Sequence, residues 1–326
     1  MKSAIVWGVL LGAVVAPVVA QDQKPAACNR SCLEGYVDRY LEAMLAHRVS
    51  DDLFAREVKF TENGVQLPLG NAGLWFRMSA RGTYKFYVPD TETQQIAYLG
   101  TVKEKERDET LTAGLVLRLK IVEGRITEIE QLVVRPEGGL TNGGAQAPRP
   151  VSTGERVEKL GAPHAVFTEV IPEAQRPSRD ELIRTANYYF SGLQRNDGKG
   201  YYPFADDCDR YENGTHAVNV PMRNPSTGVT EVMSCKKQFE VALKGVVSKV
   251  RDRRFVAVDR EKGIVFAFAF FDHENINWTW QLAELFKIEK GQIARIEAIF
   301  HQAPYGIASG WSTYEQSISS EIQDVR

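Results

Sequence analysis

The chain has 326 residues, of which 43% are hydrophobic and 25% are charged. This length accommodates about two domains of ~100–200 residues, and the composition is that of an ordinary globular protein. The formal net charge of -2 gives no electrostatic reason to expect binding to nucleic acid or to an anionic membrane surface.

The first twenty residues have the pattern of a secretory signal peptide. Lys2 precedes an apolar stretch from Ala4 to Val15, and the small residues 18–20 stand before Gln21. Such a stretch followed by a small-residue cleavage site is typical of secretory leaders. We expect residues 1–20 to be removed and the protein to be secreted, or periplasmic if the host is bacterial. No other segment approaches the ~20 apolar residues that a membrane-spanning helix needs.

Secretion favours disulfide bonds among the four cysteines. Cys28 and Cys32 lie together in the first half of the chain, and Cys208 and Cys235 lie together in the second half. We predict the pairs Cys28–Cys32 and Cys208–Cys235, rather than either pairing that would join the halves. No second Cys-x-x-Cys and no His-x-x-x-His accompanies these cysteines, so we expect no metal site.

Three sequons of the form Asn-x-Ser/Thr begin at Asn29, Asn213 and Asn277. In a eukaryotic secretory pathway they are predicted glycosylation sites.

The first half reads as one helix followed by strands. Residues 33–47 carry apolar side chains at the spacing of an amphipathic helix, and Ser31 is a suitable N-cap. Strand-like runs then cover residues 58–67, 83–88, 95–102, 111–121 and 125–134. Residues 138–155 are rich in Gly, Pro, Ala, Ser and Thr, which is the composition of a linker.

The second half repeats this order. A helix is expected over residues 181–195, an extended region over 204–220 and a second helix over 236–250. Strand-like runs follow over residues 254–258, 264–272, 279–288 and 292–301, with hairpin turns at 261–263 and 290–291.

The two halves share landmarks in the same order. Residues 120–130 and 287–297 both fit Lys-Ile-x-x-Gly-x-Ile-x-x-Ile-Glu, and the Glu-Asn-Gly at 62–64 recurs at 212–214. Each Glu-Asn-Gly follows a helix-like segment that carries a tyrosine. This self-similarity predicts a duplicated unit, and a helix followed by a long antiparallel sheet predicts an α+β unit.

The element order and these landmarks resemble the nuclear transport factor 2-like fold, also called cystatin-like, which includes ketosteroid isomerases and SnoaL-type cyclases. The chain also looks like a secreted family with two such domains. The resemblance covers residues 28–137 and 176–308 and implies an α+β protein with two tandem domains. In each domain a curved antiparallel sheet would wrap around N-terminal helices and leave an apolar pocket. Residues 138–175 would then be a linker and 309–326 a C-terminal tail.

The similarity to ketosteroid isomerases extends to single residues of the second half. Residues 204–207, Phe-Ala-Asp-Asp, match an element at the start of a long strand in those enzymes, and Glu212 stands where their base belongs. Tyr189 aligns with their tyrosine donor, and Glu284 with their protonated acid. The resemblance therefore implies that the second half is the active copy.

The first half matches less well. Tyr40 and Glu62 align with the donor and the base, but Leu117 stands where the second half has Glu284. We expect a degenerate or supporting copy in which Tyr40 and Glu62 contribute at most to binding.

Other polar and aromatic residues are candidates for the same pocket. His216 follows Glu212 by four residues, which gives both the same strand parity, so His216 is a further candidate donor. Trp278 and Trp280 point to one face of a strand, where they would wall a pocket or fill a core. His301 ends the last strand and is a candidate binding residue.

Two carboxylates and a phenol in an apolar pocket can move a proton next to a carbonyl group, because burial keeps one carboxyl protonated. We therefore expect a cofactor-independent isomerase, lyase or dehydratase that acts on a small apolar molecule, with Glu212 as the base. The chain has no Gly-rich phosphate loop and no Gly-x-Ser-x-Gly motif, which argues against nucleotide and serine-hydrolase chemistry.

A non-catalytic module that binds a small molecule or docks a protein is the alternative. Glu212 then belongs to a turn, since Asn-Gly is a hairpin signal, and Tyr189 and Tyr40 are core aromatic residues. Glu284 would make a structural pair or face solvent. In a third arrangement the two units pair sheet to sheet as an internal dimer, or the chain forms a homo-oligomer.

Overall fold

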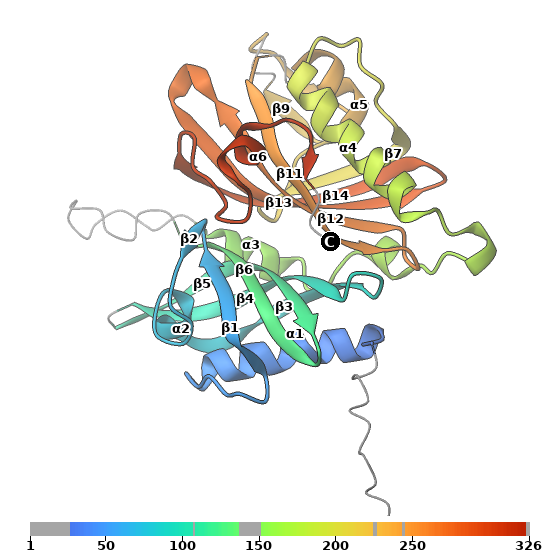
Figure 1. Cartoon of the computed structure of the whole chain (residues 1–326). Helices are drawn as coiled ribbons and strands as arrows, with labels where there is room; N and C mark the ends of the chain where they lie inside the picture. Colours follow the sequence, from blue (N-terminus) through green and yellow to red (C-terminus); the bar gives the residue numbers. More distant parts are fainter. Residues whose placement is uncertain (1–26, 107, 137–150, 224–226, 243–244, 324–326) are drawn as a thin grey trace, which may run out of the picture.

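The computed structural model describes residues 27–106, 108–136, 151–223, 227–242 and 245–323 (Figure 1). The predicted signal peptide and residues 138–150 of the predicted linker lie outside these ranges. Two large β-sheets dominate the fold.

The first half of the chain forms a six-stranded sheet with the order β2-β1-β6-β5-β4-β3. Its strands are β1 (Phe54–Glu62), β2 (Val65–Gln66), β3 (Met78–Asp90), β4 (Gln95–Glu106), β5 (Glu109–Val122) and β6 (Arg125–Val134). Its helices are α1 (Arg30–Leu45) and the short α2 (Leu74–Arg77). The sheet is mixed, because β1 pairs with β6 in parallel while the other pairs are antiparallel.

The second half forms a seven-stranded sheet with the order β15-β11-β12-β13-β14-β7-β8. Its strands are β7 (Phe204–Glu212), β8 (Thr215–His216), β11 (Lys249–Asp259), β12 (Ile264–His273), β13 (Trp278–Glu289), β14 (Gln292–Pro304) and β15 (Ile322–Gln323). The pairs β7–β14 and β11–β15 are parallel. Strands β9 (Pro221–Arg223) and β10 (Thr230–Val232) form a separate hairpin.

The longest helix of the second half is α4 (Arg179–Arg195); the shorter ones are α3 (Thr153–Lys159), α5 (Cys235–Lys237) and α6 (Tyr314–Ile318). One π-helical turn covers Gln238–Ala242, and 3-10 turns cover Ala165–Thr168, Glu173–Gln175 and Glu274–Ile276.

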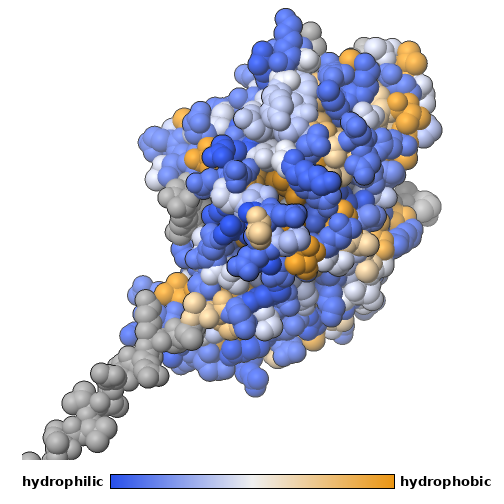
Figure 2. All heavy atoms as spheres, turned by 90° about the vertical axis from the view of Figure 1, so that its right-hand side faces the viewer, coloured by the Kyte–Doolittle hydropathy of each residue, from blue (hydrophilic) through white to orange (hydrophobic). Residues whose placement is uncertain are grey.

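Three hydrophobic clusters set the order of the layers. The apolar stripe of α1 packs on one face of the six-stranded sheet, and that of α4 packs on one face of the seven-stranded sheet. The third cluster joins the two remaining faces; Phe86 and Leu132 of the first half pack with Phe266 and Leu285 of the second. The layers therefore run from α1 through the two sheets to α4 (Figure 1). On the face shown in Figure 2, hydrophilic residues predominate and hydrophobic ones form small patches.

Polar contacts also cross between the sheets. The Arg254 guanidinium donates to both carboxylate oxygens of Glu130, at 2.7 and 2.8 Å. The Asp90 carboxylate accepts from the backbone N–H of Val258 at 3.0 Å and pairs with Arg179 of α4. These buried contacts join β6 and β3 of the first half to β11 and α4 of the second half.

The expected α+β fold with two tandem nuclear transport factor 2-like domains is wrong. The chain is mostly β, both large sheets are mixed rather than antiparallel, and few helices are long. A third hydrophobic cluster, in addition to the one in each half, packs the two sheets against each other. The helix expected over 236–250 ends within its first turns, because Gly245 has a left-handed φ of 78° and Lys249 already begins β11.

The sequence landmark Glu-Asn-Gly has the same geometry in both halves. Asn63 and Asn213 are left-handed, with φ of 51° and 50°, which asparagine tolerates better than most residues. The Asn63 side chain exchanges two hydrogen bonds with the backbone of Val133, and Asn213 does the same with Phe300. These bonds hold the turn after β1 against β6 and the turn after β7 against β14.

The segments assigned as linker and tail contribute to the fold. Helix α3 has a capping box formed by Ser152 and Glu155, and Phe167 beyond it is fully buried between the sheets. Near the C-terminus, the Trp311 indole donates to the Thr61 hydroxyl of β1 at 2.8 Å. Residues 151–175 and 309–323 therefore bind the two halves together.

Both predicted disulfides, Cys28–Cys32 and Cys208–Cys235, are confirmed. Two disulfides fit an extracellular protein. No helix in the described ranges is long and apolar enough to cross a membrane.

Candidate functional site

The candidate site lies on the face of the seven-stranded sheet that α4 covers, which we call the α4 face. Alternate residues of β13 point to this face, including Glu284. The strand register sets Glu284 beside Ala298 of β14, and Ala298 beside Glu212 of β7. On the other side of Glu284 lies Ala267 of β12. The two carboxylates therefore stand in one row, about 10 Å apart at their Cα atoms, with only the methyl group of Ala298 between them.

Glu284 and Tyr189 form the buried end of the site. Glu284 is 1% exposed and Tyr189, from α4, is 3% exposed, and their side chains share a hydrogen bond. Burial raises the pKa of Glu284 to about 8, against the opposing effects of the Tyr189 hydrogen bond and the Arg210 charge. Burial also raises the pKa of Tyr189 well above its ordinary value. At neutral pH both groups are uncharged.

One carboxyl oxygen of Glu284, Oε2, is buried and has no hydrogen-bond partner among the described residues. A buried polar atom without a partner is costly. It is the kind of feature that a bound oxygen-containing group would satisfy.

Arg210 connects this pair to solvent. It lies two residues before Glu212 on β7, is buried, and hydrogen-bonds the Tyr189 hydroxyl. Its Nε atom lies 3.1 Å from Glu212 Oε1, and the side chain of Glu212 is 36% exposed. The residues Tyr189, Glu284, Arg210 and Glu212 thus form one polar cluster that runs from the core to the surface, which we call the acid cluster.

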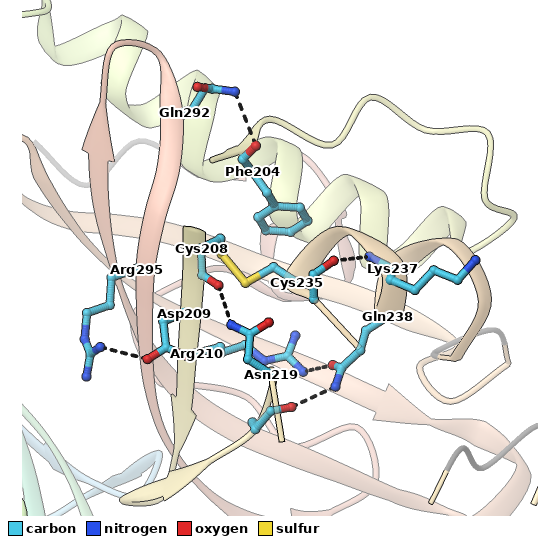
Figure 3. The surroundings of a disulfide bond; sticks show 12 residues. Phe204, Cys208, Asp209, Arg210, Asn219, Cys235, Lys237, Gln238, Gln292 and Arg295 are labelled. Carbon is cyan, nitrogen blue, oxygen red and sulfur yellow. Dashed lines mark hydrogen bonds and ion pairs between the residues drawn. A yellow bond between two sulfur atoms is a disulfide. The ribbon is translucent and has the colours of Figure 1, made fainter. Parts of the chain in front are cut away.

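The Cys208–Cys235 disulfide fixes the position of Arg210 (Figure 3). It ties β7 to α5, so that Arg210, two residues beyond Cys208, meets Gln238, three residues beyond Cys235. The Arg210 guanidinium donates to Gln238 Oε1, and Gln238 Nε2 donates to the carbonyl of Ala217 at 2.7 Å. A covalent bond therefore holds the cation of the acid cluster in place.

Helix α4 holds Tyr189 rigidly. A capping box of Ser178 and Glu181 starts the helix, which satisfies two of its free backbone N–H groups. The Tyr189 ring then contacts four phenylalanine rings, those of Phe190, Phe204, Phe239 and Phe286. The ring is thus held among aromatic side chains, while its hydroxyl group bonds Glu284 and Arg210.

The equivalent positions of the first half form a closed network. Tyr40 donates to Gln131 Oε1 at 2.9 Å and accepts from the Trp75 indole at 2.9 Å. Gln131 Nε2 donates to Glu62 at 2.8 Å, and Arg135 pairs with Glu62 at 2.8 Å. Gln131 therefore joins Tyr40 to Glu62, and both carboxylate oxygens of Glu62 have hydrogen-bond partners.

His216 belongs to β8 and lies on the sheet face opposite to Glu212, so the expectation that the two share a face is wrong. In the β7–β8 hairpin Thr215 faces Glu212 and His216 faces Tyr211. The His216 ring stacks on Tyr211 at 4.6 Å and its Nε2 pairs with Asp209. The Asn-Gly turn reverses the chain between Glu212 and His216, so parity cannot be counted through it.

Trp278 and Trp280 lie on the α4 face, where Trp280 packs on the core cluster and contacts Phe300 at 4.9 Å. His301 points the other way. Its Nε2 lies 3.1 Å from Gln281, burial lowers its pKa, and it lines a cleft of ≈ 340 Å³ between the two Asn-Gly turns. His301 is therefore separate from the acid cluster.

The three sequons differ in their surroundings. Asn29 and Asn277 are exposed, although the Asn29 oxygen caps α1 by accepting from Cys32. The Asn213 nitrogen that a glycan would need donates to the Phe300 carbonyl. The geometry of Asn213 is thus that of a structural turn rather than of a glycan attachment point.

Arg210 and Gln238 belong to this site but were not predicted from the sequence. Arg210 shares its strand parity with Glu212, which was the available signal; no local pattern marks Gln238. Within the described ranges, no group of three or more His, Cys, Asp or Glu side chains is placed to hold a metal ion.

Comparisons with known proteins give a family model and no named relative. A model described as a domain of unknown function (DUF8021) matches residues 175–300, a segment that contains the whole acid cluster. No curated protein matches the chain. Among solved structures, a de novo designed protein with a curved β-sheet matches at 16% identity and a TM-score of 0.26, covering 38% of this chain and 88% of that protein. A TM-score this low carries no argument about the fold.

Proposed function

We propose that the acid cluster moves a proton on a small, largely apolar molecule without a cofactor, as an isomerase, lyase or dehydratase would. The observation that carries the proposal is Glu284, a buried carboxyl with a pKa of about 8, a bond to Tyr189 and one unpartnered oxygen. Strongly shifted acids of this kind are concentrated at functional sites.

Each group has a separate task. Glu212 takes a proton from a carbon next to a carbonyl group, and the electron pair of that bond moves to the carbonyl oxygen. Neutral Glu284 donates a hydrogen bond to this oxygen, Tyr189 holds Glu284 in position through the hydrogen bond that it donates to the carboxyl, and the Arg210 charge stabilises the oxygen. The proton on Glu212 then returns to another carbon or to a leaving group. The row Glu284, Ala298, Glu212 supports this division, since the reacting carbon would sit over the small side chain of Ala298.

The experiment follows exchange of carbon-bound hydrogen in D₂O, using 2-tetralone as an apolar ketone probe and mass spectrometry as the readout. The full chain should speed deuterium uptake above the buffer rate. Glu212→Gln should lower the protein-dependent rate by about 10²–10⁴-fold, the usual contribution of a general base.

Asp207→Asn is the matched control, because Asp207 is an exposed acid on the same strand, and it should leave the rate unchanged. Exchange at the buffer rate for the wild type, or equal exchange for wild type and Glu212→Gln, would contradict the proposal. Retention of the ketone without exchange would instead support a carrier.

A further inference from the structure

A second feature of the α4 face lies at the end of the β12–β13 hairpin, on residues outside the acid cluster. His273 ends β12 and Trp278 begins β13, and the register sets them opposite each other. Their rings are 6.2 Å apart at the centroids. The centroid of the Trp280 ring lies 4.3 Å from that of His273 and 4.9 Å from that of Phe300. Aromatic rings therefore line this end of the face.

His273 presents a buried acceptor. The residue is 3% exposed, and its Nδ1 lies 2.6 Å from the carbonyl oxygen of Val246. A carbonyl can only accept, so Nδ1 carries the hydrogen and Nε2 is the unprotonated nitrogen. Burial lowers the pKa of His273, which keeps the ring neutral. Nε2 is buried and has no partner among the described residues.

Trp278 presents a buried donor beside it. The indole Nε1–H can only donate, and this atom is also buried without a partner in the described part of the chain. One lone acceptor and one lone donor thus occur on facing residues. The simplest single group that satisfies both is a hydroxyl group, which accepts from Trp278 and donates to His273.

We propose that His273 and Trp278 form a binding subsite for the hydroxyl group of a ring-containing phenol or alcohol, with Trp280 and Phe300 as the contacts for its ring. Trp280 and Phe300 are aromatic surfaces of the type that hold flat apolar rings. The hydroxyl group gives a hydrogen-bond partner to both His273 Nε2 and Trp278 Nε1. A ligand without a hydroxyl hydrogen leaves His273 Nε2 unpaired. The subsite does not depend on proton transfer at the acid cluster, because it is defined by binding alone.

The test compares 2-naphthol with 2-methoxynaphthalene, which has the same ring but no hydroxyl hydrogen. Affinities for the full chain are measured by ligand-observed NMR. Wild type should bind 2-naphthol about tenfold more tightly, which is the ratio that one hydrogen bond of ~1.4 kcal/mol gives. Trp278→Phe keeps an aromatic ring without the donor, and should weaken 2-naphthol. His273→Phe should bring the two affinities close to equal.

Ile276→Val is the control, because Ile276 is an exposed residue of the same turn, and it should keep the preference for the hydroxyl. Thermal unfolding of each variant verifies that the chain is folded. Equal affinities in wild type, or no binding of either compound, would overturn the proposal and leave an ordered water as the group at this position.

The two proposals fail in different ways. If the preference is lost in Glu284→Gln but kept in Trp278→Phe and His273→Phe, the hydroxyl binds at the acid cluster and the subsite is wrong. If 2-tetralone shows no catalysed exchange while the preference depends on His273 and Trp278, the subsite stands and the proton-transfer function is wrong.

Discussion

The two halves of the chain contain related polar sites that differ in whether all their buried polar atoms have hydrogen-bond partners. In each half a tyrosine on the long helix meets the row of strands that contains the Glu-Asn-Gly turn. Leu117 and Gln131 face each other in the first half, where Glu284 and Ala298 face each other in the second. The buried carboxyl of the second half thus takes the place of a leucine, and a glutamine of the first half takes the place of an alanine.

These substitutions decide whether the network closes. Gln131 has both an acceptor and a donor, so it bonds Tyr40 and Glu62 at once. Glu284 receives a bond from Tyr189 but keeps one oxygen unpaired, and Ala298 supplies nothing. A satisfied network stabilises a core, whereas an unsatisfied one is tolerated where a ligand completes it. This difference agrees with our proposal that the second half carries the chemistry and the first half supports the fold.

The largest expected effect concerns the pH dependence of stability. The pKa of Glu284 is raised in the folded state, so its contribution is fully present below the ordinary glutamate pKa and is lost as pH rises through about 8. The shift corresponds to about 5 kcal/mol of unfolding free energy lost between pH 4 and pH 9. Urea unfolding of wild type and Glu284→Gln should show this loss in wild type alone. Parallel pH profiles for the two proteins would contradict it.

The next effect tests whether the halves are one cooperative unit. Arg254→Met removes the cation that pairs with buried Glu130 across the sheets, and should lower the unfolding free energy by about 3–5 kcal/mol. Tryptophan fluorescence and far-UV circular dichroism should still show one transition for the wild type. Two separated transitions in the wild type would mean that the halves unfold independently.

A smaller effect separates the two tyrosines. Tyr40→Phe leaves the Trp75 indole and the Gln131 oxygen unpaired, and should cost about 1–3 kcal/mol. Tyr189→Phe instead removes a bond that lowers the pKa of Glu284, so that pKa should rise further. Urea unfolding measures the first change and NMR titration of the carboxyl the second. A Glu284 pKa that falls in Tyr189→Phe would argue against the acid cluster.

The smallest effect addresses the shared turn. Asn63→Ala and Asn213→Ala each remove two hydrogen bonds to the neighbouring strand, and each should cost about 1–2 kcal/mol. Because the geometry is the same in both halves, the two losses should agree to within about 0.5 kcal/mol. Chemical denaturation of the two variants checks this, and a large loss for one turn alone would weaken the equivalence of the halves.

Local patterns predicted most of the elements. The amphipathic stripes of α1 and α4 and the strand-like runs of β6, β12, β13 and β14 could be predicted because they depend on residues close together in the sequence. The region after Cys235 was misread, because its helical spacing stops at Gly245 and the β-branched Val246 and Val247 lead into β11. The mixed sheets were not readable, since the parallel pairing of β1 with β6 joins segments far apart in sequence.

The candidate site, like the elements, was predictable in part. Tyr189, Glu212 and Glu284 lie in one cluster, as the aligned landmarks suggested, whereas His216 was displaced by the hairpin turn that precedes it. Arg210 could have been predicted, because it lies two residues before Glu212 and therefore shares its strand face. The contact of Gln238 with Arg210 depends on how the disulfide places α5 against β7, which no local pattern specifies.

The protonation state of Glu284 is the most direct test of the acid cluster. Carboxyl carbons of ¹³C-labelled glutamate can be titrated by NMR between pH 4 and pH 10, with Glu284→Gln to assign the signal. We predict one glutamate that titrates near pH 8, absent in the variant. If every glutamate carboxyl of the wild type titrates below pH 6, Glu284 is ionised at neutral pH and cannot act as the donor.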